Sequence, residues 1–338
     1  MILVTGGTGL VGSHLLYYLS KDHERIRATY RNESKIQKVK HVFSYYSDDS
    51  DALFSKIEWV EATLNDIPKL TQAFLNVTHV YHCAALVSFD PNDYQQLRKI
   101  NIEGTANIIN LCLANSIQKL CYVSSVAAVG DNTRNTHLTE NTSWNPEIDH
   151  SVYAITKYGA ELEVWRGSQE GLDVVIVNPG IIIGPGFWSS SSGRLIKRIY
   201  KGLRYYTNGV SGYVDIHDVV LPMIQLMNGH HSNERYILVS ENLSFKTFAI
   251  NVANQLQVTP PKKEASKLML KLAWRLDWIN YFFRRKYRKL TKQTVTTVTT
   301  DSYYSNEKIK DALDYSFCTI DASIEKTCRL FLNDLASR

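Results

Sequence analysis

A tyrosine and a lysine four residues apart are the strongest candidates for chemistry in this sequence. Lys157 lies in a segment that we expect to be helical around Ala154–Ser168, and Tyr153 directly precedes it at the helix start. Residues i and i+4 share one face of a helix, so the phenol and the ammonium would point into one site. A nearby ammonium favours the phenolate and would lower the pKa of a tyrosine that acts as general acid or base. The alternative is an exposed pair on a helix surface.

Two serines could complete such a site. Ser124 and Ser125 come at the carboxyl end of an apolar strand, Leu120–Val123. Parallel sheets bind their ligands at that end of the strands. A hydroxyl there could hydrogen-bond a substrate oxygen while Tyr153 transfers the proton. The alternative for Ser125 is a helix cap or a turn residue.

A glycine-rich turn near the amino terminus could hold the diphosphate of a nucleotide. The apolar run Met1–Val4 is followed by residues 5–12, which read TGGTGLVG, and then by a helix expected over Ser13–Leu19. Glycines let the backbone turn tightly and approach phosphates, and the helix N-terminus offers free N–H groups. An ordinary glycine-rich turn is the alternative. The expected contacts are Gly6, Thr8, Gly9, Leu10, Val11 and Gly12.

The elements that would position these groups alternate between strands and helices along the first half of the chain. Alternation with short connections predicts an α/β fold, a Rossmann-type doubly wound parallel sheet with helices on both faces. We assign residues 1–178 to a dinucleotide-binding domain, with a return strand near 236–239, and residues 179–338 mainly to a substrate-binding domain. The expected strands are Ile2–Val4, Ile26–Tyr30, Ile57–Glu61, His79–Cys83, Lys119–Ser124 and Val174–Asn178, and further helices are Ile67–Leu75 and Tyr94–Ala114.

The second half is less regular. A serine-rich loop, Trp188–Gly193, precedes a basic helix, Arg194–Lys201, and the chain ends with a helix near Ile320–Leu335. Residues Thr294–Thr300 favour a strand because they are rich in β-branched side chains.

Segment 262–292 combines charge with apolar bulk. It holds eleven Lys or Arg residues and two acids. It could cover an apolar pocket, or lie on a membrane surface with its basic residues toward anionic headgroups. The alternative is a packed helical pair with a solvated basic face. Its apolar members are Leu268, Leu272, Trp274, Leu276, Trp278, Ile279, Phe282 and Phe283.

Composition excludes several classes of protein. The net charge of +5 comes from segment 262–292 alone, so nucleic-acid binding is not expected. The five cysteines show no pairing or metal-ligand spacing, which predicts free thiols in a reducing compartment and no metal site. We recognise no signal peptide and no apolar stretch of about 18 to 20 residues. We therefore expect a cytoplasmic location.

Six motifs occur in an order typical of one enzyme family. They are the turn at 5–12, His82-Cys83-Ala84-Ala85, Asn101-Ile102-Glu103-Gly104-Thr105, the strand and turn over 122–130, the pair Tyr153 and Lys157, and Asn178-Pro179-Gly180. On these motifs the chain resembles, over nearly its whole length, an extended short-chain dehydrogenase/reductase of the NAD-dependent epimerase/dehydratase superfamily. Within it, the dihydroflavonol-reductase-like and 3β-hydroxysteroid-dehydrogenase-like branch fits best.

The resemblance implies a role for each matching residue. Ser125 would position the substrate oxygen, and Tyr153 would donate or accept the proton. Lys157 would lower the pKa of Tyr153 and hold the nicotinamide ribose. Asn101 would order the active-site helix, serve a proton-relay water, or be purely structural. Further cofactor contacts are implied at Thr63, Leu64, Cys83, Ala84, Ala85, Ser124, Asn178, Pro179 and Gly180.

The end of the second strand bears on the choice of cofactor. Relatives that select NAD carry an acid there, whereas this chain has Arg31, with Lys35 and Lys38 nearby. An arginine suits a 2′-phosphate through charge-assisted pairing and stacking on adenine. NADP(H) is therefore favoured and NAD(H) remains an option. A solvated surface arginine is the alternative, and Thr63-Leu64 departs from the Asp-Leu pair of many relatives.

These features together predict an NADP(H)-dependent reductase of a ketone or aldehyde on a fairly hydrophobic small molecule, or the reverse alcohol oxidation. Sugar dehydratases of the family need an acidic residue soon after the catalytic serine. Residues 126–128 offer none, so dehydration is disfavoured. One alternative is a nucleotide-sugar epimerase with retained NAD, in which Arg194, Lys197 and Arg198 would bind phosphates. Another is a non-catalytic scaffold that senses NADP(H). A homodimer could form through the helices that contain Asn101–Ala114 and Tyr153–Arg166.

Overall fold

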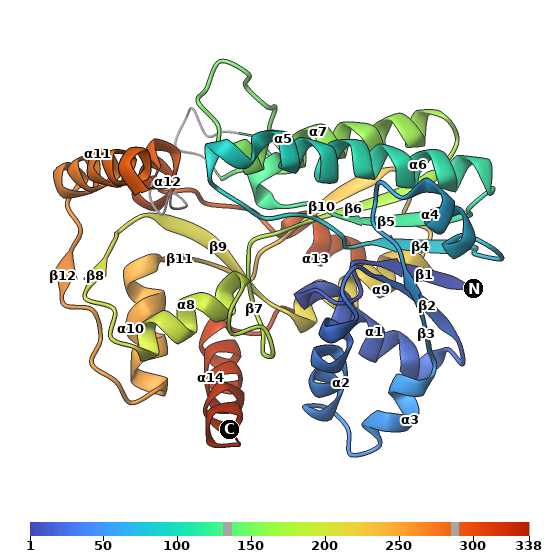
Figure 1. Cartoon of the computed structure of the whole chain (residues 1–338), viewed down its shortest axis with the longest axis horizontal. Coiled ribbons are helices and arrows are strands. Elements are labelled where there is room, and N and C mark those ends of the chain that lie inside the picture. The colour runs from blue at the N-terminus through green and yellow to red at the C-terminus, as the bar shows by residue number, and fades with distance from the viewer. Residues whose placement is uncertain (131–136, 285–290, 338) are drawn as a thin grey trace.

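A seven-stranded parallel sheet forms the centre of the protein (Figure 1). The computed structural model describes residues 1–130, 137–284 and 291–337, without the side chains of residues 191, 279–284 and 294. The strands lie in the order β10-β6-β5-β4-β1-β2-β3. This confirms the predicted Rossmann-type α/β fold. The strands are β1 (Ile2–Thr5), β2 (Ile26–Tyr30), β3 (Ile57–Glu61), β4 (His79–His82), β5 (Lys119–Val123), β6 (Asp173–Pro179) and β10 (Glu234–Leu238).

The order of the strands fixes where a ligand can bind. The chain starts at β1, moves outward to β2 and β3, and then crosses back to β4 on the other side of β1. Open α/β sheets bind ligands at the carboxyl ends of the strands where the direction reverses in this way. The glycine turn follows β1 and Ser125 follows β5, so both lie at this edge of the sheet.

Helices cover both faces of the sheet, as Figure 1 shows. One face is covered by α1 (Leu10–Asp22), α2 (Ile36–Ser44), α3 (Ser50–Ser55) and α9 (His217–Asn228). The other is covered by α4 (Ile67–Ala73), α6 (Gly104–Ala114) and α7 (Val152–Gln169).

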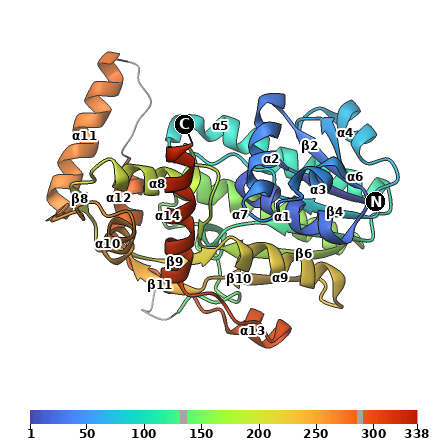
Figure 2. The ribbon, with the colours of Figure 1, turned by 90° about the horizontal axis from the view of Figure 1, so that it is seen from below.

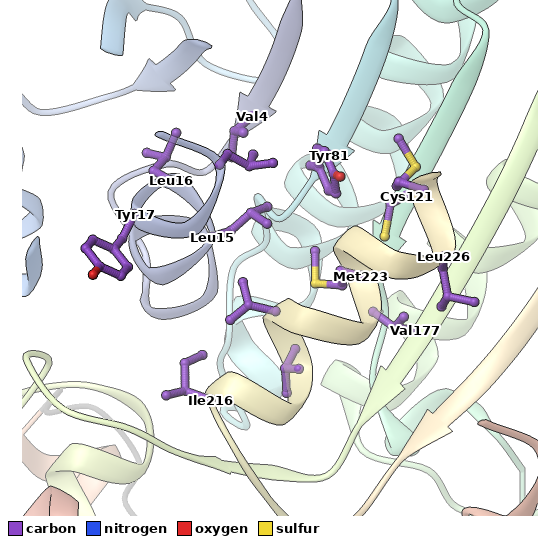
Figure 3. Packing of buried hydrophobic residues seen from close by; sticks show 14 of the residues in the cluster. Val4, Leu15, Leu16, Tyr17, Tyr81, Cys121, Val177, Ile216, Met223 and Leu226 are labelled. Atoms are coloured by element: carbon purple, nitrogen blue, oxygen red, sulfur yellow. The ribbon is translucent and has the colours of Figure 1, made fainter. Parts of the chain in front are cut away.

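Two of the helices that form the core on the α1 face, α1 and α9, lie directly against the strands (Figure 3). Leu15 and Leu16 of α1 and Met223 of α9 are fully buried against strand residues such as Val4 and Val177. Each such side chain contributes about 1.5–3 kcal/mol relative to an exposed one. This packing fixes α1, and with it the glycine turn, against the sheet.

The expected helix over Tyr94–Ala114 has an irregular middle. It consists of α5 (Tyr94–Leu97), a π-helical stretch over Arg98–Glu103 and then α6. π-Helical stretches inside α-helices are frequent at functional sites. This stretch contains Asn101, one of the expected site residues.

A second lobe packs beside the carboxyl edge of the sheet. Its core joins Tyr213, Phe248 and Phe331 from a small sheet and two helices. The elements are β7 (Ile181–Ile183), β9 (Val210–Asp215) and β11 (Glu241–Ser244), with α8 (Ser191–Tyr200), α10 (Phe245–Gln255) and α14 (Ile320–Ala336), and a pair of short strands, β8 (Tyr205–Tyr206) and β12 (Lys263–Glu264). At one end of the molecule lie α11 (Lys267–Arg284) and α12 (Lys292–Thr299).

The chain after residue 178 returns to the central sheet more than once. Strand β10 pairs with β6, with Tyr236 opposite Val177, as the return strand predicted near 236–239 requires. Helix α9 and helix α13 (Glu307–Leu313) also contribute to the core on the α1 face, through residues such as Met223 and Ile309. The central sheet is therefore completed by the second half of the chain.

The strand predicted over Thr294–Thr300 is wrong, because these residues belong largely to helix α12. The threonine hydroxyls bond carbonyls four residues back, for example Thr296 to Lys292 O (3.2 Å) and Thr299 to Val295 O (2.9 Å). Val295 is also buried against Leu270 of α11. Side-chain hydrogen bonds and helical packing together outweigh the β-preference of threonine and valine.

The cysteines, all of which lie in the described part of the chain, agree with the expectation of free thiols. All five cysteines are free, and Cys112, Cys121 and Cys328 are buried. Among the described residues, no group of three or more His, Cys, Asp or Glu side chains could hold a metal ion. Nor is any described helix both long enough and apolar enough to span a bilayer.

Candidate active site

The glycine turn between β1 and α1 is shaped by close backbone contacts. Gly6 has φ +70°, and a Cβ there would lie 2.7 Å from the Ala84 backbone. A Cβ on Gly12 would collide with the Gly6 carbonyl oxygen. Both positions therefore require glycine, one for its positive φ and both for lack of space.

Gly9 differs from its two neighbours because the space beside it is open. Apart from its chain neighbours, the one atom of the described residues within 4 Å of a Cβ at Gly9 would be Gly6 O, at 3.3 Å. Gly9 is also the N-cap of α1, and neither a capping side chain nor an acid in the first turn blocks the free N–H groups. An open position at an uncapped helix N-terminus fits a diphosphate. The residues present therefore fit the expected dinucleotide.

Arg31 lies just beyond β2, on the same edge of the sheet. Its side chain is exposed, and no ion pair with another described residue holds its guanidinium. Asn32 beside it caps the following turn by accepting a hydrogen bond from Ser34 N–H (3.0 Å). Thr63 is exposed, whereas Leu64 is buried and its side chain packs against Gly104. Arg31 is thus free to reach a phosphate, while Leu64 serves packing.

Ser125 and Tyr153 come together at the carboxyl end of β5. Ser125 Oγ caps a short 3₁₀ helix (Val126–Ala128) by accepting from Ala127 N–H (3.2 Å), so the capping alternative applies as well. Burial raises the pKa of Tyr153, and a side-chain hydrogen bond with Ser125 opposes that rise. A serine that donates to the phenol oxygen stabilises the phenolate. The two side chains are therefore placed to act on one oxygen atom.

Lys157 is buried one turn along α7 from Tyr153. Its ammonium donates to Tyr122 Oη (2.6 Å) and to Val123 O (2.8 Å), and lies 4.3 Å from the Tyr122 ring centroid. Burial lowers the pKa of Lys157 to about 7. Its hydrogen bonds in this structure go to β5, and none of them reaches the Tyr153 phenol. The predicted effect of Lys157 on the pKa of Tyr153 stays a prediction.

Asn101 ties the loop after β4 to α7. Its Oδ1 accepts from Leu86 N–H (2.8 Å), and its Nδ2 donates to Leu86 O (3.0 Å) and Thr156 Oγ1 (3.2 Å). Thr156 is adjacent to Lys157 and three residues from Tyr153. These bonds agree with an ordering role for Asn101, one of the alternatives that the sequence left open.

Ser124 and Asn178, both expected to contact the cofactor, have side chains directed into the protein. Ser124 Oγ donates to Glu161 Oε2 (2.7 Å), and Asn178 Nδ2 donates to the same atom (3.0 Å) and to Ser125 O (3.0 Å). The Asn178 side chain is fully buried. Their contacts with a cofactor stay predictions.

Glu161, the buried carboxylate at the centre of this network, was not among the site residues expected from the sequence. Glu161 also accepts from Arg235 Nη1 (2.8 Å), so it links the carboxyl ends of β5 and β6 to β10. Glu161 is four residues after Lys157, on the helix face that already carries Tyr153. A charged residue on that otherwise buried helix face is the feature of the sequence from which Glu161 could have been predicted.

Two other neighbours of the site were also missed. Tyr122, which accepts the Lys157 bond, looks like an ordinary strand residue in the sequence. Phe89 lies in the loop after β4, with its ring 5.4 Å from the Tyr153 ring and 48% of its surface exposed. Val87 in the same loop is 57% exposed. Phe89 therefore presents exposed apolar surface beside the Tyr153 ring.

The remaining expected contacts line the same edge of the sheet. Ala84 packs against Gly6, as described above, and Cys83 N–H bonds Thr5 O (3.2 Å). Pro179 ends β6, and Gly180 N–H bonds Leu238 O (3.1 Å). Ala85 lies in the same loop as Ala84. The structure brings these residues to one edge without assigning a ligand to any of them.

The chain is similar to known proteins over most of its length. The model of the NAD dependent epimerase/dehydratase family matches residues 2–238. A putative dihydroflavonol 4-reductase from Synechocystis sp. is 30% identical over 280 residues, 80% of this chain and 77% of that protein. Sterol demethylase protein B from Methylococcus capsulatus is 31% identical over 244 residues, 71% of this chain and 70% of that protein. The crystal structure of gox2253 matches with a TM-score of 0.82 at 25% identity, covering 99% of this chain and 98% of that chain.

Proposed function

Since the chain belongs to the NAD dependent epimerase/dehydratase family and is an NAD(P)-dependent oxidoreductase, we propose that it uses NADP(H) to reduce a ketone or aldehyde on a fairly apolar small molecule. The observation that carries this proposal is the placement of Ser125, directly after β5, near enough to Tyr153 of α7 to oppose the burial-driven rise in the pKa of its phenol, at the ligand-binding edge of the sheet. We assign dinucleotide binding mainly to residues 1–178 and substrate binding mainly to residues 179–338.

The chemistry needs a hydride and a proton. NADP(H), when bound, supplies or accepts the hydride. Tyr153 donates the proton from its phenol to the carbonyl oxygen, and the Ser125 hydroxyl holds that oxygen in place. Lys157 provides positive charge one helical turn from the phenol, which favours the phenolate left after the transfer. The same residues run the reverse oxidation.

Preference for the 2′-phosphorylated cofactor rests on Arg31. Its guanidinium is exposed at the end of β2 and is not committed to an acid in the described part of the chain. An arginine can bind a phosphate with two parallel hydrogen bonds, which an NAD ribose without the phosphate cannot use.

An apolar substrate is supported by the surroundings of Tyr153 and by the relatives. Phe89 presents exposed apolar surface next to the Tyr153 ring, and Val87 in the same loop is also exposed. Two relatives are named for a dihydroflavonol and for a sterol, both largely apolar molecules. A sugar nucleotide would instead require cations that bind its diphosphate, the role that the epimerase alternative gives to Arg194, Lys197 and Arg198.

Titration calorimetry on the cofactor-stripped protein tests the cofactor choice. We expect NADPH to bind at least tenfold more tightly than NADH, and Arg31→Asp to remove or reverse that preference. Arg25→Asp is a matched control, because Arg25 is also exposed near β2 but is paired with Glu58. Tight retention of NAD without any preference for the 2′-phosphate would contradict the proposal and favour the epimerase.

Replacing the phenol tests the catalytic assignment. Tyr153→Phe removes the proton donor and keeps the ring, so turnover of carbonyl substrates should fall by at least about 100-fold. Cofactor affinity should change little, which calorimetry would verify. Normal turnover in this variant would show that another group transfers the proton.

A further inference from the structure

Helix α11 carries a repeated pair of residue types on its exposed side. Lys267-Leu268, Lys271-Leu272 and Arg275-Leu276 follow each other at intervals of four residues. Side chains four apart lie above one another on a helix. The three leucines therefore form one ridge, and the three basic residues form a second ridge about 100° away round the helix axis.

The leucine ridge is among the most exposed apolar surfaces of the described chain. Leu268 is 70% exposed, Leu272 54% and Leu276 60%. The opposite side of the helix is the packed one, because Leu270 is 8% exposed and contacts Val295 of α12. Figure 2 shows α11 projecting from the rest of the protein at one end of the molecule. The leucine ridge is thus not a face that α11 needs for folding.

Positive charge extends beyond α11 onto the neighbouring strands. Strand β12 pairs with β8, with Lys263 opposite Tyr205, and Lys263 N–H bonds Arg204 O (3.2 Å). Lys262, Lys263 and Arg204 are all exposed. Basic residues from two segments distant in sequence therefore gather at the base of the projecting helix.

We propose that α11 docks the protein on an anionic membrane surface. Leu268, Leu272 and Leu276 enter the boundary between headgroups and acyl chains, and the adjacent basic ridge binds lipid phosphates. The anionic headgroups of such a membrane complement the positive charge of the basic ridge. A second copy of the chain would bring two strongly basic surfaces together, which costs energy. The helix lies on the bilayer and does not cross it.

The docking helix is linked to the candidate active site. Helix α12 packs on α11 and donates two hydrogen bonds to the Asp149 carboxylate. The donors are Lys292 Nζ (3.0 Å) and Gln293 Nε2 (3.2 Å). Asp149 is four residues before Tyr153, in the loop that leads into α7. If the proposed function holds, this link connects the membrane-docked helices to the loop before the reactive phenol, and a membrane is where a lipid-soluble carbonyl compound concentrates. The docking itself does not depend on the reaction.

Vesicle sedimentation with the full chain tests the proposal. We expect binding to phosphatidylcholine vesicles that contain 30–40% phosphatidylglycerol, roughly tenfold or more stronger than to phosphatidylcholine alone, and weaker binding as salt rises. The triple variant Leu268→Ser, Leu272→Ser, Leu276→Ser should lose at least about tenfold in apparent affinity. Leu75→Ser is the matched control, because Leu75 is 57% exposed outside this surface and should leave binding unchanged.

A second variant, which removes charge only, tests the contribution of the basic ridge to vesicle binding separately from that of the leucine ridge. Lys267→Gln, Lys271→Gln, Arg275→Gln should abolish the preference for anionic vesicles. Circular dichroism and the melting temperature confirm folding of each variant, and the single change Leu272→Ser serves if the triple variant fails. The proposal is overturned if the wild type does not bind anionic vesicles, or if the leucine variant binds them equally well. It is also overturned if the leucine changes split a dimer in sedimentation velocity, because the ridge is then an interface between copies.

Discussion

Replacing the buried carboxylate of Glu161 by an amide tests whether the network at the strand ends holds the site together. In the wild type this carboxylate, 1% exposed, accepts hydrogen bonds from Ser124, Asn178 and Arg235 at 2.7, 3.0 and 2.8 Å. Glu161→Gln keeps the shape of the side chain and removes its charge. Arg235 then remains largely buried, with 16% of its side chain exposed, without a counter-charge.

The cost of this change follows from the contacts. Removing one partner of a buried ion pair costs about 3–5 kcal/mol. Arg235 keeps its hydrogen bonds to the Glu140 and Thr142 carbonyls, which favours the lower end of that range. The new amide N–H₂ must also face a donor, either Arg235 or Asn178, which costs about 1 kcal/mol more. We expect a loss of about 3–4 kcal/mol.

Thermal unfolding measures that loss. An unfolding entropy of about 2.1 cal/mol/K per residue, for 338 residues, turns it into a drop in Tm of about 4–6 °C. Glu163→Gln is the control on the same helix, because Glu163 pairs with Arg166 at the surface, where such pairs contribute about 0–1 kcal/mol. Its Tm should fall by no more than about 1 °C. Equal shifts in the two variants would refute the argument that Glu161 holds a buried network.

Further predictions concern the glycine turn and acid pH. Gly9→Ala should fold normally, because its Cβ meets only Gly6 O at 3.3 Å, but should weaken NADPH binding at least about tenfold in calorimetry. Gly12→Ala should instead lower the Tm, because its Cβ collides with the Gly6 carbonyl; a Tm equal to that of Gly9→Ala would contradict this. Burial lowers the pKa of His14 and His82 to about 3. Below pH 6.5 these histidines therefore become protonated in the unfolded chain but stay neutral in the folded one, which favours unfolding. Each histidine should therefore reduce stability by about 2 kcal/mol at pH 5, measured by denaturant unfolding at several pH values. Asp218, whose pKa burial raises to about 6, offsets part of this loss, and a flat profile between pH 7 and pH 5 would contradict the argument.

Features that depend on neighbours in the sequence could be predicted. Strands Ile26–Tyr30 and Ile57–Glu61 have the bounds expected from the sequence, and Tyr153 and Lys157 lie on one helix as expected. Glycine spacing, helical periodicity and apolar runs are local properties, because they act through backbone geometry within a few residues. Gly6 and Gly12 belong to this class, since the turn itself brings them together.

Partners that are distant in sequence could not be predicted. Lys157 bonds Tyr122, 35 residues away, and Glu161 bonds Arg235, 74 residues away. The sequence does not specify which pairs meet, because that depends on the order of strands in the sheet. The helix at Lys292–Thr299 was missed for the same reason, since Val295 is buried only when α12 packs on α11.

The sequence by itself therefore determined the sheet, the glycine turn and the tyrosine-bearing helix. The tertiary structure alone decided that the Lys157 ammonium donates a hydrogen bond to Tyr122. It likewise decided that Glu161 accepts hydrogen bonds from residues at the ends of three strands. It also decided that the leucines of α11 face outward. Local preferences act over one or two turns of chain, whereas burial and charge pairing are settled only when remote segments pack against each other.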